Sequence, residues 1–342
     1  MYFCMQVTCN MKIEELIKHK ILILDGAMGT MIQRYKLNEE DYRGTRFREW
    51  KTDLKGNNDL LSITQPDIIK NIHLEYFEAG ADIIETNTFN SNRISMTDYD
   101  MQDWVHELNL ASVQVAKQAR EEYWNKNGTK PLFIAGSMGP TSKTASISPD
   151  VNDPAYREVD FDYLAEIYKE QAVSLIQAGA DILLVETIFD TLNAKAAFFG
   201  IEEAFDTTGK KLPLMASGTI TDAAGRTLSG QTTEAFLVSL SHLPLLSIGL
   251  NCALGAEQLF QYLEILANKA PFYLSAYPNA GLPNPLGGYD ETPVMMAEKV
   301  QLYLENQLVN ILGGCCGTTP EHIKLFSELA SKYTPRTIPL TK

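Results

Sequence analysis

Eight short apolar runs recur along the chain, and turn residues bound each of them. They lie at residues 21–26, 82–89, 132–139, 181–188, 212–220, 245–253, 272–281 and 309–317. Runs of this length that are almost wholly apolar predict strands that are buried on both faces, as in a parallel sheet.

Amphipathic stretches separate most of these runs. Residues 65–81, 164–180 and 232–243 place apolar side chains at spacings of three and four, which predicts helices. Residues 78–89 and 177–189 also resemble each other, because each has a helix end, a glycine, and a strand ending in a carboxylate followed by threonine. The glycine suits the left-handed residue that closes many helices.

The alternation of strands and helices predicts an α/β fold, a single (β/α)8 TIM barrel, with a doubly wound open sheet as the alternative. We interpret residues 1–11 as an N-terminal extension, residues 12–330 as the barrel, and residues 331–342 as a C-terminal tail or linker. Longer inserts at 36–60 and 141–160 follow the first and third strands, on the face where active-site loops of a barrel lie.

Charge and hydropathy narrow the class of protein. A formal net charge of -14 argues against nucleic acid as a partner, because phosphate backbones are bound by clustered lysine and arginine. No apolar run reaches the ~20 residues of a membrane helix, and the N-terminus has no export signal, so no membrane partner is expected. We therefore expect a cytoplasmic enzyme.

Three of the five cysteines fall at the ends of predicted strands. Cys252 ends the sixth strand, and Cys315 and Cys316 end the eighth, so their thiols can converge on one rim of a barrel. Three thiolates fit a zinc ion that keeps its fourth position for water or substrate. The alternatives are small buried hydrophobes or a redox pair, which adjacent cysteines disfavour. Cys4 and Cys9 are assigned no role.

Two carboxylates, Asp25 and Glu186, end apolar strands at the same rim. Charge is costly there unless a cation or a donor meets it, so we predict that they bind the ammonium group of a substrate. The alternative is that each caps a helix or pairs with a basic side chain. The turn DGAMGT lacks the phosphate-loop pattern, and the backbone amides around Gly26 are expected to hold a carboxylate. No strand ends in lysine, which counts against a Schiff-base aldolase.

Seven motifs resemble the homocysteine-binding barrel of cobalamin-dependent methionine synthase. They are LDGAMGT, ETNTFNSN, GSMGP, VETIFDTLNAKAA, GLNCALG, YPNAGLPN and GGCCGTTPEHI. The resemblance covers about residues 12–330. The cysteine pattern is shared by the wider homocysteine S-methyltransferase family, including the betaine and S-methylmethionine enzymes, whereas residues 85–100 and 189–205 are more similar to the cobalamin-dependent branch.

The resemblance implies a methyltransferase that binds homocysteine as a zinc thiolate and methylates it from methylcobalamin, forming methionine. It implies Cys252, Cys315 and Cys316 as the zinc ligands, with Asn279 as a provisional fourth ligand that homocysteine displaces. It also implies that two carboxylates hold the substrate ammonium, while the other contacts meet its carboxylate or line the pocket. The implied substrate contacts are Asp25, Gly26, Asn87, Ser137 and Glu186.

The same resemblance implies partners that carry the methyl group. A corrinoid (cobalamin-binding) domain or protein and a folate-binding domain are expected in trans or in a longer chain, because only SKYTPRTIPLTK follows the barrel here. Two alternatives stay open. One is a stand-alone homocysteine methyltransferase that uses S-methylmethionine or a betaine, and the other is a non-catalytic zinc-stabilised binding domain.

Overall fold

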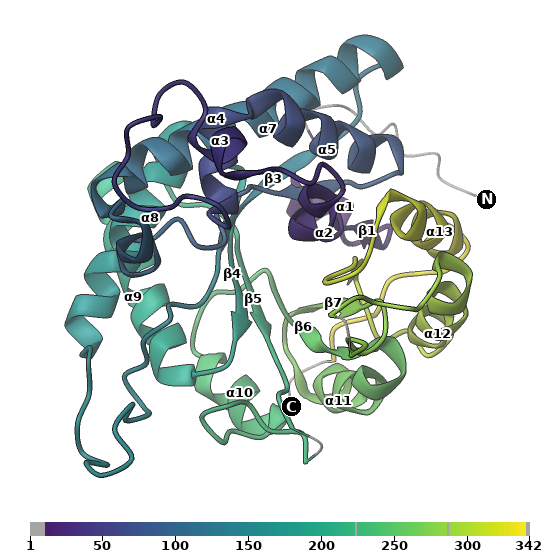
Figure 1. Cartoon of the computed structure of the whole chain (residues 1–342). Coiled ribbons are helices and arrows are strands. Elements are labelled where there is room, and N and C mark those ends of the chain that lie inside the picture. Colours follow the sequence, from purple (N-terminus) through teal and green to yellow (C-terminus); the bar gives the residue numbers. More distant parts are fainter. Residues whose placement is uncertain (1–10, 223, 286, 340–342) are drawn as a thin grey trace.

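Eight parallel strands form a nearly closed barrel in the computed structural model, which describes residues 11–222, 224–285 and 287–339 (Figure 1). The strands are β1 Leu22–Ile23, β2 Ile83–Glu85, β3 Phe133–Met138, β4 Ile182–Ile188, β5 Leu214–Gly218, β6 Ser247–Gly255, β7 Tyr273–Asn279 and β8 Ile311–Leu312. Each strand from β2 to β8 pairs with the next, and β8 pairs with β1. A parallel bridge between Leu24 and Ile83 joins β1 to β2 and closes the ring. The TIM barrel is confirmed, and the open doubly wound sheet is wrong.

Helices surround the strands as an outer ring in Figure 1. The long helices are α5 Pro66–Glu78, α7 Val105–Asn127, α8 Phe161–Ala178, α9 Thr191–Thr208, α10 Thr233–Leu240, α11 Ala256–Lys269, α12 Pro293–Glu305 and α13 Pro320–Ala330. The short helices are α1 Ile13–Leu16, α2 Met28–Gln33, α3 Glu39–Arg43, α4 Leu61–Thr64 and α6 Arg93–Met96, with 3-10 turns η1 Asn58–Leu60, η2 Thr97–Tyr99 and η3 Gln102–Trp104. The three amphipathic stretches thus correspond to α5, α8 and α10.

Local chemistry sets the ends of these helices. The Asp160 side chain accepts a hydrogen bond from the Tyr163 N–H and so caps the start of α8. Gly179 ends the same helix with a φ of +92°, and Gly80 follows α5 with a φ of +106°. The left-handed glycines predicted from the two similar units are therefore confirmed.

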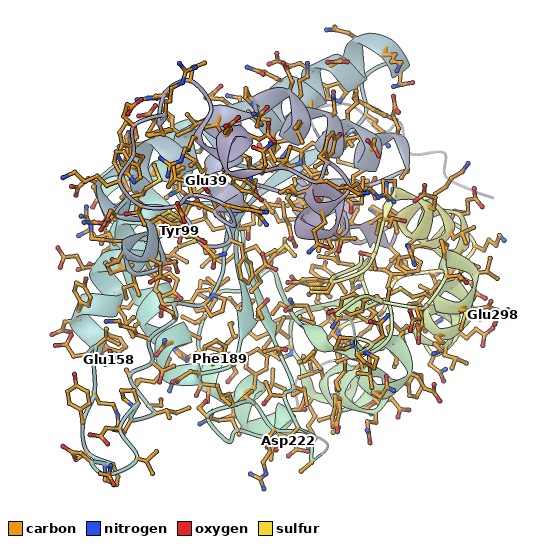
Figure 2. All side chains as sticks on the ribbon, in the orientation of Figure 1. Glu39, Tyr99, Glu158, Phe189, Asp222 and Glu298 are labelled. Carbon is orange, nitrogen blue, oxygen red and sulfur yellow. The ribbon has the colours of Figure 1, made fainter. Side chains whose placement is uncertain are left out.

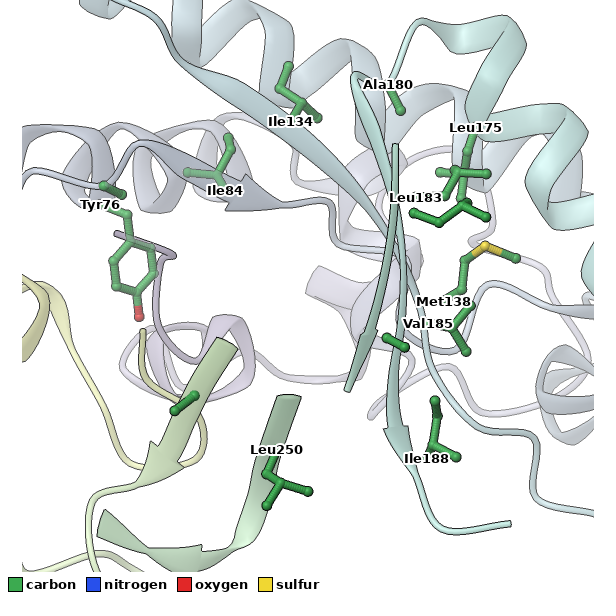
Figure 3. Close-up of a cluster of buried hydrophobic side chains, with 14 of the residues drawn as sticks. Tyr76, Ile84, Ile134, Met138, Leu175, Ala180, Leu183, Val185, Ile188 and Leu250 are labelled. Carbon is green, nitrogen blue, oxygen red and sulfur yellow. The ribbon is translucent and has the colours of Figure 1, made fainter. Parts of the chain in front are cut away.

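Successive strand residues divide the core into two layers. In β2, Ile83 belongs to the cluster inside the barrel, and its neighbour Ile84 belongs to the cluster between strands and helices. Figure 3 shows the outer layer, where Leu183 of β4 lies beside Leu175 of α8. Fully burying one such side chain stabilises the fold by about 1.5–3 kcal/mol.

The amino-terminal end of the barrel is closed by the chain's own segments. Ile13 and Leu16 of α1 pack into the interior cluster. Arg336 is buried, and its guanidinium donates to the carbonyl oxygens of Ala267 and Ala270 at the end of α11. The amino-terminal end of the barrel interior is thus packed by α1.

Two expectations concern the chain as a whole. Cys4 and Cys9 lie outside the residues that the structure describes. Across the described ranges, none of the helices combines the length and the apolar character needed to cross a membrane.

Candidate active site and metal centre

A cavity of about 570 Å³ opens at the carboxyl ends of the strands. The predicted site residues that line it are Asp25, Gly26, Asn87, Ser137, Glu186, Cys252, Cys315 and Cys316. The fold therefore brings the predicted strand ends together at one rim of the barrel. Asn279 is buried beside the cavity without lining it, and its Oδ1 has no hydrogen-bond partner among the described residues.

The three thiols form a compact cluster. Their Sγ atoms all lie within 4.8 Å of one another, and those of Cys252 and Cys316 are 3.8 Å apart. Sulfurs at the corners of a tetrahedron around zinc, each about 2.3 Å from the ion, are about 3.8 Å apart. The thiol cluster therefore fits a zinc ion with three protein ligands. The cysteines are free, so they form no disulfide with each other.

Hydrogen bonds among the thiols favour one thiolate. Bonds from Cys252 and Cys315 lower the pKa of Cys316 to about 3. The pKa of Cys315 rises well above its usual value, because its thiol is hydrogen-bonded to Cys252 and Cys316. A metal ion requires deprotonated cysteine ligands, and one of the three is already favoured in that form.

Two strands bend where they reach the cavity. The strand register shifts near the end of β4 and near the end of β6, as it does at a bulge. Thr187 has a φ of +55°, Cys252 of +60° and Ala253 of +55°, a region that L-residues rarely adopt. Each such residue costs about 1–3 kcal/mol and persists only where its surroundings hold it. The bends turn Glu186 and Cys252 into the cavity.

The cysteine doublet follows β8 and is held against β7. The Cys315 N–H donates to the Pro278 carbonyl at 2.9 Å, and the Cys316 carbonyl accepts from the Ala280 N–H at 2.9 Å. Gly317 comes next, with a φ of +81°, and a Cβ there would lie 2.4 Å from the Cβ of Tyr289. Glycine is therefore required both by the turn and by the close approach.

Three carboxyl groups line the same cavity as the thiol cluster. Asp25 and Glu186 are the predicted pair, and Glu85 at the end of β2 is the third. Asp25 Oδ2 accepts the Glu85 N–H at 3.1 Å, and Glu186 Oε1 accepts the hydroxyl of Ser137. Asp25 Oδ1 and Glu85 Oε1 have no partner among the described residues. Within the described part of the chain, neither predicted carboxylate pairs with a basic side chain.

Burial makes these carboxyl groups hard to ionise. It raises the pKa of Asp25 well above its usual value, and the charge of Glu186 raises it further. Burial likewise raises the pKa of Glu85, with Glu186 and Asp25 adding to the rise. The pKa of Glu186 is raised to about 7, chiefly by burial. The described lining of the cavity contains no lysine, arginine or histidine.

Two of the predicted substrate contacts, Asn87 and Ser137, are hydrogen-bonded to other residues of the protein. Asn87 Nδ2 donates to the carbonyl of Asn58 and to Ser62 Oγ, which fixes the η1 turn beside the cavity. Ser137 gives its hydroxyl hydrogen to Glu186 and therefore orients that carboxylate. At Gly26 a Cβ would lie 2.8 Å from Thr318 Oγ1, so the backbone approaches closely there.

Several residues of the cavity wall have no role in the sequence prediction, among them Glu85, Tyr277 and Tyr289. The signal for Glu85 was present, because the two similar units both end their strand in a carboxylate followed by threonine. Tyr277 is buried on β7, and its hydroxyl has no partner among the described residues. Tyr289 comes from the loop before α12, and no strand pattern places it.

A second cavity of about 340 Å³ adjoins the first. The two share Asp59, Phe89 and Asn90 in their walls. Tyr99 and Phe189, both labelled in Figure 2, lie in the wall of the second cavity. The site therefore has room beyond the carboxyl and thiol groups.

Comparisons with solved structures agree with the fold. Among solved structures, the chain resembles the homocysteine methyltransferase MmuM from Escherichia coli in its oxidised form, with a TM-score of 0.71 and 22% identity over 92% of this chain and 97% of that chain. The metallated form gives a TM-score of 0.71 and 23% identity over 92% of this chain and 98% of that chain. At such identities the likeness concerns the fold alone.

The family assignment rests on a separate match. The model of the homocysteine S-methyltransferase family matches residues 22–330, which include every strand, the thiol cluster and the three carboxyl groups. The chain therefore belongs to the homocysteine S-methyltransferase family and is a methyltransferase.

Proposed function

We propose that this protein is a zinc-dependent methyltransferase that methylates homocysteine from methylcobalamin and forms methionine. The observation that carries the proposal is the composition of one cavity, which is lined by three thiols and three carboxyl groups and whose described lining offers no basic side chain. Such a cavity suits two cations, a soft metal ion and an ammonium group.

The thiol cluster supports zinc as the metal. Cys252, Cys315 and Cys316 would hold the ion through their sulfurs, and the 3.8 Å spacing of Cys252 and Cys316 matches two tetrahedral corners. When bound, zinc would lower the pKa of the homocysteine thiol so that it reacts as a thiolate. We also propose that Asn279 Oδ1, buried without a partner, serves as a provisional ligand before substrate binds.

The carboxyl groups support an amino acid as substrate. The unpartnered oxygens of Asp25 and Glu85 can accept hydrogen bonds from an ammonium group, and Glu186 lines the same cavity. Binding of that cation would favour ionised carboxyl groups and so offset the cost of burying them. Gly26 lies next to Asp25 in the lining, and we assign the substrate carboxylate to the amides at that turn.

The choice of methylcobalamin rests on the motifs that resemble the cobalamin-dependent branch, at residues 85–100 and 189–205. A methyl group attached to a corrinoid must arrive on another domain or protein, with a folate-binding domain as its source, and we place this chemistry in the cytoplasm. The space that adjoins the site through Phe89 and Asn90 provides a route for such a donor.

One observation favours a second donor class. The match to this barrel covers 97% of the MmuM chain. A homocysteine methyltransferase can therefore consist of one barrel. A small donor such as S-methylmethionine or a betaine is therefore the alternative to methylcobalamin.

The test combines metal analysis with a donor assay. The purified protein should carry close to one zinc per chain and should methylate homocysteine faster with methylcobalamin than with S-methylmethionine or betaine. If S-methylmethionine or betaine gave the faster reaction, the protein would instead be an enzyme that uses a small methyl donor. Absence of methionine with all three donors, from protein that holds zinc, would contradict the proposed reaction and would favour the zinc-stabilised binding domain.

A single variant tests the metal ligands. Cys252→Ala should lose zinc and at least roughly 1,000-fold in activity, since a catalytic metal supplies several kcal/mol to the transition state. A variant that kept stoichiometric zinc would contradict the assignment. His242→Ala is the matched control, because His242 does not line the cavity, and it should retain both properties.

A further inference from the structure

Asn251 lies on β6 immediately before Cys252 and is fully buried. Its Oδ1 accepts the backbone N–H of Thr187 at 3.1 Å and the hydroxyl of Ser217 at 2.7 Å. Its Nδ2 donates to Thr187 Oγ1 at 2.8 Å and to Cys315 Sγ at 3.9 Å. Two accepted and two donated bonds use all the ordinary capacity of a side-chain amide.

The orientation of this amide follows from its partners. A backbone N–H can only donate, so the amide atom that faces the Thr187 N–H must be the oxygen. The NH₂ group then has to face Cys315 Sγ, and the usual ambiguity between the two ends of an asparagine side chain does not arise. A donor is thus aimed at one of the three thiols.

The same amide connects the two bent strands. Thr187 follows Glu186 on β4 and has a φ of +55°, while Cys252 follows Asn251 on β6 and has a φ of +60°. Thr187 contacts Asn251 through both its backbone and its hydroxyl. The amide therefore spans from the residue after a carboxyl group to the sulfur of a thiol.

We propose that Asn251 is a positioning residue of the metal centre, which donates its N–H to the Cys315 thiolate and holds Thr187 in its left-handed conformation. This inference rests on the proposed zinc site. An N–H donor stabilises negative charge on sulfur, and hydrogen bonds to the ligands of a metal orient them and tune their donor strength. Removing such a partner typically lowers metal affinity on the order of 10- to 100-fold.

Ser217 on β5 provides the matched control. Its hydroxyl donates to Asn251 Oδ1, on the side of the amide away from the thiol, and it is fully buried like Asn251. Ser217→Ala therefore disturbs the same buried network while the NH₂ group keeps its direction. If Asn251 had only a structural role, variants at both positions would act alike.

The discriminating variant is Asn251→Asp, which has nearly the same shape. Its carboxylate can still accept from the Thr187 N–H and from Ser217, and the Thr187 hydroxyl can reverse its bond by rotation. Only the contact with Cys315 changes from attraction to repulsion. Asn251→Ala, which adds no charge, carries the same expectation with a smaller effect if the aspartate variant does not fold.

The experiment measures zinc affinity by competition with a chromophoric chelator, the near-ultraviolet thiolate-to-metal band of the Co²⁺-substituted protein, and thermal unfolding without metal. Asn251→Asp should weaken zinc binding on the order of 10- to 100-fold and move the band to lower energy, because an unassisted thiolate is more electron-rich. Ser217→Ala should lower thermal stability and leave the affinity and the band as in the parent.

Two results would overturn the inference and are distinguishable. Equal affinities and bands for Asn251→Asp and Ser217→Ala, in a parent protein that binds zinc, would refute the positioning role alone. A parent protein that binds no zinc would refute both this role and the proposed function.

Discussion

The cavity has two unlike sides, and both are costly without a cation. The thiol side consists of Cys252, Cys315 and Cys316, and the carboxyl side consists of Asp25, Glu85 and Glu186. Soft sulfur ligands select a metal such as zinc, whereas buried carboxylates with free oxygens select an ammonium donor. A ligand that carries both a thiol and an ammonium group therefore has one partner on each side.

The two sides also differ in how the backbone presents them. At β1 the Asp25 N–H continues the ladder and donates to the Ile83 carbonyl at 3.0 Å, and neither Asp25 nor Glu85 has a positive φ. On the thiol side, Cys252 and Ala253 both have left-handed conformations. Asp25 and Glu85 are thus carried by nearly regular strand ends, whereas Glu186 and Cys252 lie where their strands bend.

The largest expected effect that tests the difference between the two sides is a change of protein stability with pH. The pKa of Glu186 is about 7 in the fold against 4.5 as its ordinary value. Between these pH values the folded state therefore binds more protons than the unfolded state. The stability that this difference contributes is fully present below pH 4.5 and is lost as the pH rises through 7. Each pKa unit is worth ~1.4 kcal/mol, so the loss is about 3 kcal/mol.

Glu186→Gln should remove this loss. Without metal or substrate, the variant should unfold at a higher temperature than the parent at pH 8, and the gap should shrink toward pH 5. Thermal melts at the two pH values measure it, and Glu166→Gln, at an exposed position of α8, is the control that should show no such trend. If the difference in unfolding temperature between the variant and the parent did not change with pH, burial of the Glu186 charge would not be what destabilises the parent.

A smaller effect tests whether the carboxyl side binds substrate while the thiol side binds the metal. Asp25→Asn and Glu85→Gln should each raise the KM for homocysteine by roughly 10- to 100-fold, since a hydrogen bond to a charged group contributes about 1.5–3 kcal/mol. Zinc content should stay at the parent level, because neither residue belongs to the thiol cluster. Steady-state kinetics with metal analysis measures both quantities.

Glu85 sharpens this test. An unchanged KM for Glu85→Gln, beside a raised KM for Asp25→Asn, would reduce the carboxyl side to the two residues expected from the sequence. Loss of zinc from either variant would contradict the division into two sides.

The fold and most of the candidate site could be predicted from the sequence. Parallel strands are buried on both faces, so they read as continuous apolar runs, and a barrel brings their carboxyl ends to one rim. The sixth and eighth runs end in cysteines, which suffices to place Cys252 near Cys315. Glu85 ends the second run as Glu186 ends the fourth, each followed by threonine, so the same pattern indicates both residues.

The rest depends on geometry that no local pattern encodes. Thr187 and Cys252 have left-handed conformations, and Thr187 donates its N–H to Asn251 on another strand; these residue types give no signal of either feature. Tyr289 reaches the thiols from a loop whose path no periodicity fixes. The engagement of Ser137 with Glu186 joins two strands, and sequence alone does not pair side chains across strands.

The smallest effect tests whether the thiol side stores backbone strain. Ala253 has a φ of +55°, which costs an L-residue roughly 1–2 kcal/mol, while Ala→Gly loses about 0.4–1 kcal/mol through the unfolded chain. Ala253→Gly should therefore leave the metal-free protein about as stable as the parent or up to ~1.6 kcal/mol more stable. Ala276→Gly, in a regular and fully buried part of β7, has no strain to release and should destabilise it. Equal destabilisation by both changes, in parallel thermal melts, would mean that the bend in β6 stores no strain.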